Sequence, residues 1–242
     1  MIVLIITAVR VKSMDSHRIS GRILAENIAG PGMLRLVEQS MQAQARKTSV
    51  TEIAVKERKH PQAALTFDDG PDIRYTPLLL DGLKERNVRV SFFLLGEKVE
   101  QYPELVERMQ KEGHLVGNHT YHHVQLNKLN ETKAREEILK TNNLIYETTG
   151  VYPLYLRPPF GAWKKNLELC VEMLPVFWTI DTLDWKVQNT EKIVRTVQEQ
   201  IEDGAIILMH DEYDTSVEAA LQVVDELKNQ GYELVTVDQL IL

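Results

Sequence analysis

Two adjacent aspartates are the first sign of a reactive site in this sequence. In the stretch LTFDDGPD, residues 65–72, Asp68 and Asp69 stand where the apolar run AALTF is expected to leave a sheet as a buried strand. Two like charges at the rim of a core repel each other and are costly to desolvate. An Asx-turn with Gly70 and Pro71 explains one aspartate and leaves the other without a role. The pair therefore indicates chemistry that needs both carboxylates.

The histidine-rich stretch GNHTYHH offers candidate metal ligands. His119 and His123 are four residues apart, so on a helical turn their rings would share a face within reach of one ion. Imidazole is a natural ligand for Zn²⁺ and similar divalent metals. A pair of surface histidines is the alternative interpretation, and His122 is interpreted as outward-facing.

The aspartates and the histidines complement each other chemically. Two histidines need a carboxylate to complete a metal site that keeps positions open for water and substrate. One of Asp68 and Asp69 could bind the metal while the other stays a general base, because adjacent residues leaving a strand point in different directions. The charge of the metal would also remove the repulsion between the two carboxylates. We therefore expect one divalent-metal site.

Further polar residues indicate the groups that would handle protons. His210 follows the apolar run AIILM, and a protonated imidazole opposite a metal-bound water is suited to donate a proton to a leaving amine. Asp184, in DTLDW, could hold that imidazole, and Arg157, in LRPPFG, could pair with the unligated aspartate. Taken singly, His210 also fits an ordinary histidine at the rim of the core, and Arg157 fits a surface salt bridge. Trp185, next to Asp184, also fits an ordinary core aromatic.

From His60 onward the sequence alternates between strand-like and helix-like segments. The expected strands are residues 63–67, 88–96, 114–120, 154–161 with its loop, 176–181, 205–211 and 233–237. The expected helices are residues 76–87, 102–113, 130–150, 166–174, 190–204 with Thr190 as N-cap, and 216–231. This alternation predicts parallel strands joined by crossover helices. About seven repeats favour a closed or nearly closed barrel over an open sheet.

The polar clusters all come directly after predicted strands. In a parallel barrel the carboxyl ends of the strands lie on one face, where enzymes of this architecture have their active sites. Residues as far apart in the sequence as Asp68 and Asp211 would then meet in one mouth. The strand pattern therefore supports a single site made of all the clusters.

Composition limits the classes of protein that fit. The chain has 242 residues, enough for one large α/β domain or two small ones, and 43% of them are hydrophobic and 26% charged. A net charge of −7 argues against nucleic-acid binding, which needs a basic face. The single cysteine, Cys170, cannot form an internal disulfide and is interpreted as a buried, inert thiol.

The N-terminal residues differ from the rest of the chain. MIVLIITAV is too short to span a bilayer, and its basic residues follow the apolar run, whereas in a secretory signal they precede it. It is interpreted as the remnant of an export signal, with a first strand or helix as the alternative. Residues 13–60 are polar and fit an extension or stalk, with an amphipathic helix over 34–47 as the alternative. We predict an N-terminal extension over 1–60, membrane association only through it, and a catalytic domain over 61–242.

Five ordered motifs resemble those of the NodB-homology polysaccharide deacetylases, also called carbohydrate esterase family 4, which remove N- or O-acetyl groups from glycans. The motifs are TFDDG at 66–70, HTYHH at 119–123, RPPFG at 157–161, DTLDW at 181–185 and LMHD at 208–211. The resemblance runs from about Ala63 to the C-terminus and rests on the order and spacing of all five. It implies a distorted (β/α) barrel with about seven parallel strands, which agrees with the segment count.

The resemblance also implies a role for each matching residue. Asp68 resembles the catalytic base and Arg157 the residue that tunes it. His210 is similar to the catalytic acid, with Asp184 orienting it. The implied metal ligands are Asp69, His119 and His123. The implied substrate-binding residues are Phe160, through its backbone N–H, and Trp185 and Leu208, around the acetyl methyl group.

The sequence departs from the family pattern in two places. Phe160 stands where tyrosine is usual, and because the backbone N–H is kept, we expect the lost hydroxyl to affect sugar contacts more than catalysis. His122 and Val124 replace the more usual serine and proline around the second metal histidine, and we expect both changes to be tolerated.

The resemblance implies one divalent metal ion, Zn²⁺ first, with Co²⁺, Mn²⁺ or Ni²⁺ as alternatives, and an acetylated glycan as partner. GlcNAc of bacterial peptidoglycan is the expected substrate, ahead of chitin oligomers, MurNAc and xylan, and the expected location is the cell envelope or the outside of a bacterial cell. The alternatives are a metal-dependent amidohydrolase or esterase acting on another acylated substrate, and a glycan-binding barrel without catalysis. The oligomeric state does not follow from the sequence.

Overall fold

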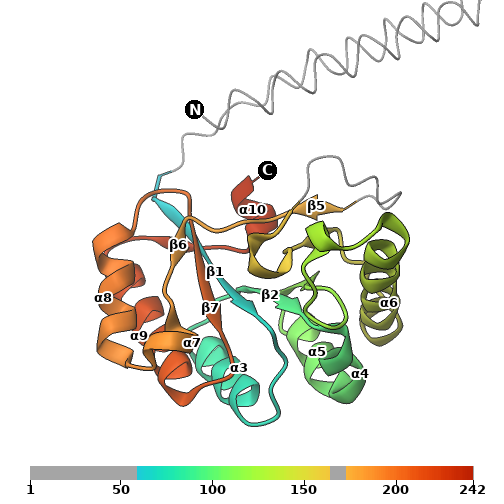
Figure 1. The fold of residues 1–242 in the computed structure, drawn as a ribbon. Helices are drawn as coiled ribbons and strands as arrows, with labels where there is room; N and C mark the ends of the chain where they lie inside the picture. The colour runs from blue at the N-terminus through green and yellow to red at the C-terminus, as the bar shows by residue number, and fades with distance from the viewer. Residues whose placement is uncertain (1–58, 164–172, 242) are drawn as a thin grey trace, which may run out of the picture. The chain divides into compact units, whose positions relative to one another are not determined.

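A parallel β-sheet organises the computed structural model, which describes residues 59–163 and 173–241 (Figure 1). The strands are β1 (Gln62–Asp68), β2 (Ser91–Leu94), β3 (Leu115–Asn118), β4 (Tyr155–Leu156), β5 (Leu174–Pro175), β6 (Ile180–Asp181), β7 (Ala205–His210) and β8 (Glu233–Leu234). They run in the order β5-β4-β3-β2-β1-β7-β6, and β8 pairs with the beginning of β1. Each strand pair among the described residues is parallel, as the sequence pattern predicted.

Helices connect the strands and surround the sheet. They are α3 (Tyr75–Glu85), α4 (Gly96–Gln101), α5 (Pro103–Lys111), α6 (Glu131–Thr149), α7 (Asp184–Val187), α8 (Thr190–Gln200), α9 (Asp214–Asn229) and α10 (Val237–Ile241), with short 3₁₀ turns at Leu126–Lys128 and Pro159–Gly161. Figure 1 shows α3, α5, α6, α8 and α9 around the outside of the sheet. The curled parallel sheet with its outer helices confirms the predicted fold class.

Alternate side chains of the central strands enter two different cores. In β1, Ala63, Leu65 and Phe67 belong to the large core beneath the helices, together with residues such as Leu79 of α3 and Val223 of α9. The residues between them point to the opposite face, because side chains alternate along a strand. The outer positions therefore stabilise the fold and the inner positions are available for a site.

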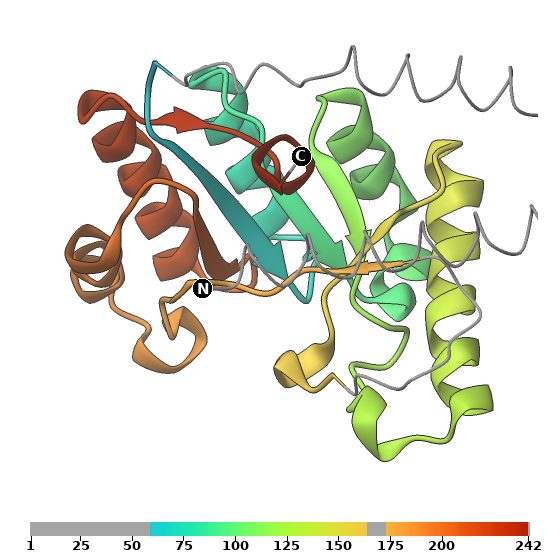
Figure 2. The same cartoon turned by 90° about the horizontal axis from the view of Figure 1, so that it is seen from above.

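The inner face of the curled sheet has a smaller core. Ala64 of β1 and Phe93 of β2 pack there with Tyr155, Val176 and Val237. Val237 belongs to α10, which lies in the middle of the curl when the molecule is viewed from above (Figure 2). The amino-terminal half of the inner face is thus filled with apolar side chains, and the polar residues lie toward the carboxyl ends of the strands.

Several elements differ from those expected from the sequence. Residues 176–181 give only the short strand β6, because Val176 N–H donates to Leu156 of β4 while Thr179 N–H donates to Ile206 of β7. The strand expected over 233–237 ends at Leu234 and is followed by α10. Helix α4 was not predicted, and the N-cap of α8 is Asn189 instead of Thr190, since the Asn189 side chain accepts the Lys192 N–H.

Some expectations fall outside the described residues. The predicted N-terminal extension lies almost wholly before residue 59, and Cys170 with most of its predicted helix lies within residues 164–172. These interpretations stay predictions. Across residues 59–163 and 173–241, the helices are too short or too polar to cross a membrane.

Candidate active site

Asp68 and His210 end two neighbouring strands. Asp68 is the last residue of β1 and His210 the last residue of β7, and the two are register partners in the parallel ladder. Thr66 and Leu208 are paired in the same way two residues earlier. Since these positions alternate with the residues of the outer core, all of them face the inside of the curled sheet.

A buried ion pair holds Asp68. Nη1 of the fully buried Arg157 donates to Asp68 Oδ1 at 2.8 Å and to Thr66 Oγ1 at 2.6 Å. The guanidinium carbon lies 4.3 Å from the ring centroid of Phe93. Burial lowers the pKa of Arg157, whereas the Asp68 carboxylate acts in the opposite direction. Each charge needs the other, because a buried charge without its partner is strongly destabilising.

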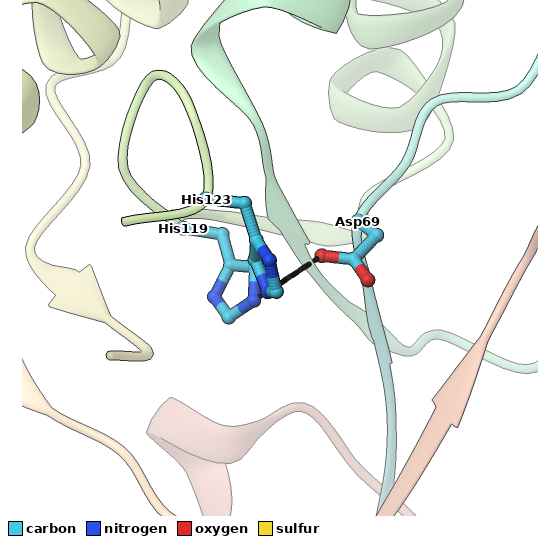
Figure 3. Close-up of side chains that lie close together, drawn as sticks. All are labelled: Asp69, His119 and His123. Atoms are coloured by element: carbon cyan, nitrogen blue, oxygen red, sulfur yellow. Dashed lines mark ion pairs between the residues drawn. The ribbon is translucent and has the colours of Figure 1, made fainter. Parts of the chain in front are cut away.

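Asp69, His119 and His123 form a cluster that could hold a metal ion (Figure 3). One ligand atom from each residue lies within 4.8 Å of the others. Asp69 Oδ1 is 3.3 Å from His119 Nε2 and 3.4 Å from His123 Nε2. Asp69 follows β1 and the two histidines follow β3, so the sheet brings together residues from two separate motifs.

The geometry of the cluster fits a divalent metal ion. Zinc binds imidazole nitrogen and carboxylate oxygen at about 2.0–2.2 Å, so tetrahedral ligand atoms lie roughly 3.3 Å apart. Asp69 Oδ1, which is at this spacing from both rings, is buried and has no hydrogen-bond partner in the described part of the chain. His119 Nδ1 lies 2.6 Å from the Arg157 carbonyl oxygen, which can only accept a hydrogen bond. Nδ1 therefore donates to this carbonyl, and Nε2, on the side of Asp69, is the ring atom left for a metal ion.

The backbone of the candidate ligands is irregular. Asp69 has a φ of 69°, Thr120 of 67° and His123 of 54°. Residues other than glycine enter this left-handed region at a cost, and such residues cluster at functional sites. The helical turn expected over residues 119–123 is wrong, because the chain there forms neither helix nor strand. The two rings nevertheless lie together, with their centroids 5.1 Å apart.

The surroundings of the cluster favour the protonation states that bind metal. Burial alone would raise the pKa of Asp69, but the neighbouring imidazoles of His119, His123 and His210 lower it well below its ordinary value. Burial lowers the pKa of His123, while the Asp69 carboxylate acts in the opposite direction. A charged carboxylate and a neutral imidazole are the forms that coordinate a metal ion.

Asp184 orients His210. Asp184 Oδ1 lies 2.8 Å from His210 Nδ1, and Asp184 Oδ2 accepts the backbone N–H of His210 at 2.8 Å. Burial alone would lower the pKa of His210, but the fully buried Asp184 and the charges of Asp68 and Asp69 raise it to about 9. His210 Nε2 lies 3.8 Å from Asp69 Oδ2. The raised pKa favours a protonated His210 imidazole beside the candidate metal cluster.

The three residues expected to bind substrate have different environments. Phe160 is 61% exposed, has a φ of 61°, and its ring centroid lies 4.5 Å from that of His123. Leu208 is buried two residues before His210, and Trp185, which follows Asp184 in α7, is 49% exposed. Phe160 therefore contacts a candidate metal ligand, whereas Trp185 directly follows Asp184 and Leu208 lies two residues before His210 in the sequence.

Two buried polar residues at the site were not identified from the sequence. Thr66 bonds to Arg157, and its spacing of two from Asp68 in a buried strand was the available signal. Asn118 ends β3, and its side-chain oxygen accepts the Thr120 N–H at 2.7 Å. His122, interpreted as outward-facing, is exposed and lies 2.8 Å from Glu137 Oε1, away from the cluster around Asp69.

Comparisons with known proteins agree with these motifs. A family model described as polysaccharide deacetylase matches residues 55–176. The peptidoglycan-N-acetylglucosamine deacetylase PgdA of Listeria monocytogenes is 42% identical over 185 residues, which cover 76% of this chain and 40% of the relative. The peptidoglycan-N-acetylmuramic acid deacetylase PdaC of Bacillus subtilis is 43% identical over 177 residues, which cover 73% of this chain and 38% of the relative. The chain thus spans about two fifths of the length of these relatives.

A comparison of structures leads to the same group of proteins. A solved structure of the peptidoglycan deacetylase PdaC from Bacillus subtilis superposes with a TM-score of 0.73 at 42% identity, covering 76% of this chain and 91% of that chain. Its match extends well beyond the region of the family model, which contains only the first three of the five motifs. Motifs, family model and fold lead to one conclusion: this chain belongs to the polysaccharide deacetylase family.

Proposed function

We propose that this chain is a metal-dependent hydrolase that removes N-acetyl groups from a polysaccharide, with GlcNAc of bacterial peptidoglycan as its substrate. The observation that carries the proposal is the pairing of Asp68 with His210 beside the cluster of Asp69 and two histidines. A carboxylate and a protonated imidazole next to a metal-binding cluster are the groups that amide hydrolysis needs. The name of the relative PgdA supports GlcNAc as the sugar.

Asp69, His119 and His123 are the proposed metal ligands. Two imidazoles and a carboxylate suit Zn²⁺, and we propose Zn²⁺ as the ion, with Co²⁺, Mn²⁺ and Ni²⁺ as competitors for the same donor set. When bound, the ion supplies Lewis acidity toward the carbonyl oxygen of the acetamide.

Asp68 is the proposed general base. Its Oδ1 is held by Arg157, and its Oδ2 lies on the side of the cluster, 3.7 Å from His119 Nε2. In this position Asp68 takes a proton from water as the water oxygen bonds to the acetyl carbon. Arg157 keeps the carboxylate in place and balances its charge inside the protein.

His210 is the proposed general acid. Its Nδ1 is occupied by Asp184, so Nε2 is the atom that gives a proton to the sugar nitrogen as the bond to the acetyl carbon breaks. Asp184 stabilises the imidazolium before the transfer, in the way that a buried aspartate supports a catalytic histidine.

Three residues are proposed to bind the acetyl group. The backbone N–H of Phe160 donates to the oxyanion that develops on the carbonyl oxygen. Leu208 and Trp185 surround the methyl group, and the half-exposed Trp185 ring is then covered by substrate. The exposed Phe160 ring, which lacks a hydroxyl, contacts the neighbouring sugar.

The test is acetate release from N-acetyl chitooligosaccharides and from peptidoglycan by metal-stripped protein, before and after addition of Zn²⁺, with mass spectrometry of the sugars. Zinc-dependent loss of acetyl groups is expected. Bound zinc without release from these glycans or from acetyl-xylan would overturn the proposal in favour of a glycan-binding barrel. Because the relative PdaC is named for N-acetylmuramic acid, digestion of the treated peptidoglycan decides the sugar, and loss of acetyl from MurNAc alone would correct the substrate.

We further propose that residues 61–242 are the catalytic domain, that residues 1–60 are an extension, and that the protein acts in the cell envelope or outside a bacterial cell. The glycan named for the relatives belongs to the cell wall, which supports this location. Fractionation of bacteria that produce the full chain should recover it with the envelope or the medium, and recovery from the cytosol alone would contradict the location.

A further inference from the structure

The loop with both candidate histidine ligands has a backbone that does not hold its shape by itself. Residues 119–123 form neither helix nor strand, and Thr120 and His123 lie in the left-handed region of φ. Such residues persist only where the surrounding structure determines their conformation. Figure 3 shows the His119 and His123 rings close together and near Asp69, and contacts from outside the loop must maintain this arrangement.

Glu137 of α6 makes three contacts with this loop. Its Oε2 accepts the backbone N–H of Tyr121 at 3.0 Å and that of His122 at 2.9 Å. Its Oε1 lies 2.8 Å from His122 Nδ1. The Glu137 side chain is only 16% exposed, so water competes little for these bonds. A single carboxylate thereby fixes the two residues that precede His123.

A second side chain fixes the start of the loop to the same helix. Asn118 Oδ1 accepts the Thr120 N–H, while Asn118 Nδ2 donates to the Ile138 carbonyl at 2.9 Å and to Asn142 Oδ1 at 2.7 Å. Helix α6 has 19 residues and is capped at both ends, by the Asn130 side chain and by Gly150. It is therefore a rigid support for the loop.

The contact with His122 also separates the three histidines of the loop by role. His122 lies between the two candidate ligands in the sequence and offers the same imidazole donors. Its ring is held by Glu137, whereas Nε2 of His119 and of His123 lie within 3.4 Å of Asp69 Oδ1. With Glu137 removed, the loop could turn the wrong imidazole toward a metal ion.

We propose that Glu137 is a positioning residue of the metal site, which sets the spacing of His119 and His123 and keeps His122 out of the coordination, an inference that rests on the proposed metal site. The role depends on the length of the side chain more than on its charge. Glutamine has the same length, with an oxygen for the two backbone N–H groups and an amide that can face His122. Aspartate keeps the charge and is one methylene too short to reach the loop from α6.

The test compares zinc affinity among metal-stripped variants of the full chain: Glu137→Gln, Glu137→Asp and Glu137→Ala. The matched control is Glu136→Ala, at the exposed neighbouring glutamate of the same helix. Affinity is measured by competition with a chromogenic chelator. Circular dichroism and thermal melting without metal verify the fold, and the visible spectrum of the Co²⁺-loaded proteins reports the coordination geometry.

The zinc affinity of the variants should follow the length of the side chain at position 137. Glu137→Asp and Glu137→Ala should weaken zinc binding by roughly 10- to 100-fold, the usual effect of losing a residue that orients metal ligands. Their Co²⁺ spectra should change, and adding His122→Ser to Glu137→Ala should change the spectrum again, because the competing imidazole is then gone. Glu137→Gln should stay within about threefold of the unaltered protein, and Glu136→Ala should be unchanged.

Three results would overturn the inference. One is zinc affinity and a Co²⁺ spectrum in Glu137→Asp and Glu137→Ala equal to those of the unaltered protein. Another is the reversed order, with Glu137→Gln weak and Glu137→Asp normal, which would make charge the cause. The third is loss of fold in both Glu137→Asp and Glu137→Ala, which would place the role in folding; if only Glu137→Ala fails to fold, Glu137→Asp decides. An unaltered protein that binds no metal would instead overturn the proposed function.

Discussion

The Thr66 hydroxyl joins a strand to the buried ion pair. It donates to the Ile207 carbonyl at 2.7 Å and accepts from Arg157 Nη1. Valine has the same shape without a donor or acceptor, so Thr66→Val leaves two buried groups short of a partner. We expect the free energy of unfolding to fall by about 1–3 kcal/mol, measured by urea denaturation. The control is Thr196→Val, at a solvent-exposed bond to Lys192, which should change it by less than about 0.5 kcal/mol. Equal effects of the two changes would contradict the role of Thr66.

Asp68 and Asp69 are neighbours with separable roles. Asp68→Asn removes the proposed base while asparagine can still accept a hydrogen bond from Arg157, so the ion-binding cluster around Asp69 should remain intact. We expect kcat for acetate release to fall at least about 100-fold, with zinc still bound at one ion per chain by elemental analysis. A variant that loses its zinc would reverse the assignment of the two aspartates.

At the scale of elements, the strands β1 and β7 were well predicted from the sequence. The runs AALTF and AIILMHD predicted β1 and β7, and the period of two in a strand explains why Asp68 and His210 share the inner face. Their motifs also predicted which polar side chains would gather, because the carboxyl ends of parallel strands meet on one face. The position of each motif directly after a strand was therefore enough to predict that the polar clusters would meet.

The conformation of the loop over residues 119–123, which contains both candidate histidine ligands, could not be predicted. A spacing of four between His119 and His123 fits a helical turn, yet the loop is held in part by Glu137, which no local pattern connects to it. Asn118 offered a local signal, because its side-chain oxygen accepts the N–H two residues on, as in an Asx-turn. The short helix α10 did have a local signal. Thr236 and Gln239 form the pattern of a capping box, and the Thr236 N–H donates to Gln239 Oε1 at 3.2 Å. The sequence carries no local signal for the long-range contact of Glu137, whereas the local pattern at Thr236 was present and was overlooked.

The free energy of unfolding should depend on pH through a buried histidine beside the beginning of β2 and β3. Just before β3, His114 Nδ1 accepts the Val90 N–H at 3.1 Å. Burial lowers the pKa of His114 to about 4, with Arg89 and Arg108 acting in the same direction and Glu112 against them. A histidine in the unfolded chain takes up its proton near pH 6.5, so between these values the unfolded state binds more protons.

The free energy of unfolding should therefore decrease as the pH falls from about 6.5 to about 4, by about 3 kcal/mol at most, and the contribution of His114 should be constant outside this window. Urea denaturation at several pH values measures it, with His114→Asn as the comparison, because asparagine can accept the same hydrogen bond without titrating. The same pH dependence in the variant would exclude His114 as the cause.

At the scale of the whole molecule, a metal ion would join the ends of β1 and β3. Zinc at 100 times its dissociation constant should raise the free energy of unfolding by about 2.7 kcal/mol, since the unfolded chain lacks the assembled ligands. For a chain of this size the melting temperature should rise by about 5–10 °C. Calorimetry with and without zinc measures the shift, which Asp69→Asn should greatly reduce. An equal shift in this variant would place the zinc elsewhere.

The register partnership of Asp68 and His210 also makes completion of the proposed site depend on the C-terminal part of the chain. β1 is synthesised early and β7 late, so β1 cannot pair with β7 until most of the domain has been synthesised. A chain interrupted before residue 205 contains Asp68 and the three proposed metal ligands and lacks His210. Such a fragment also lacks the strand that pairs with Ala63–Asp68, so we do not expect it to hold the proposed ligands in place. The proposed site is therefore complete only when the C-terminal part of the domain has joined the sheet.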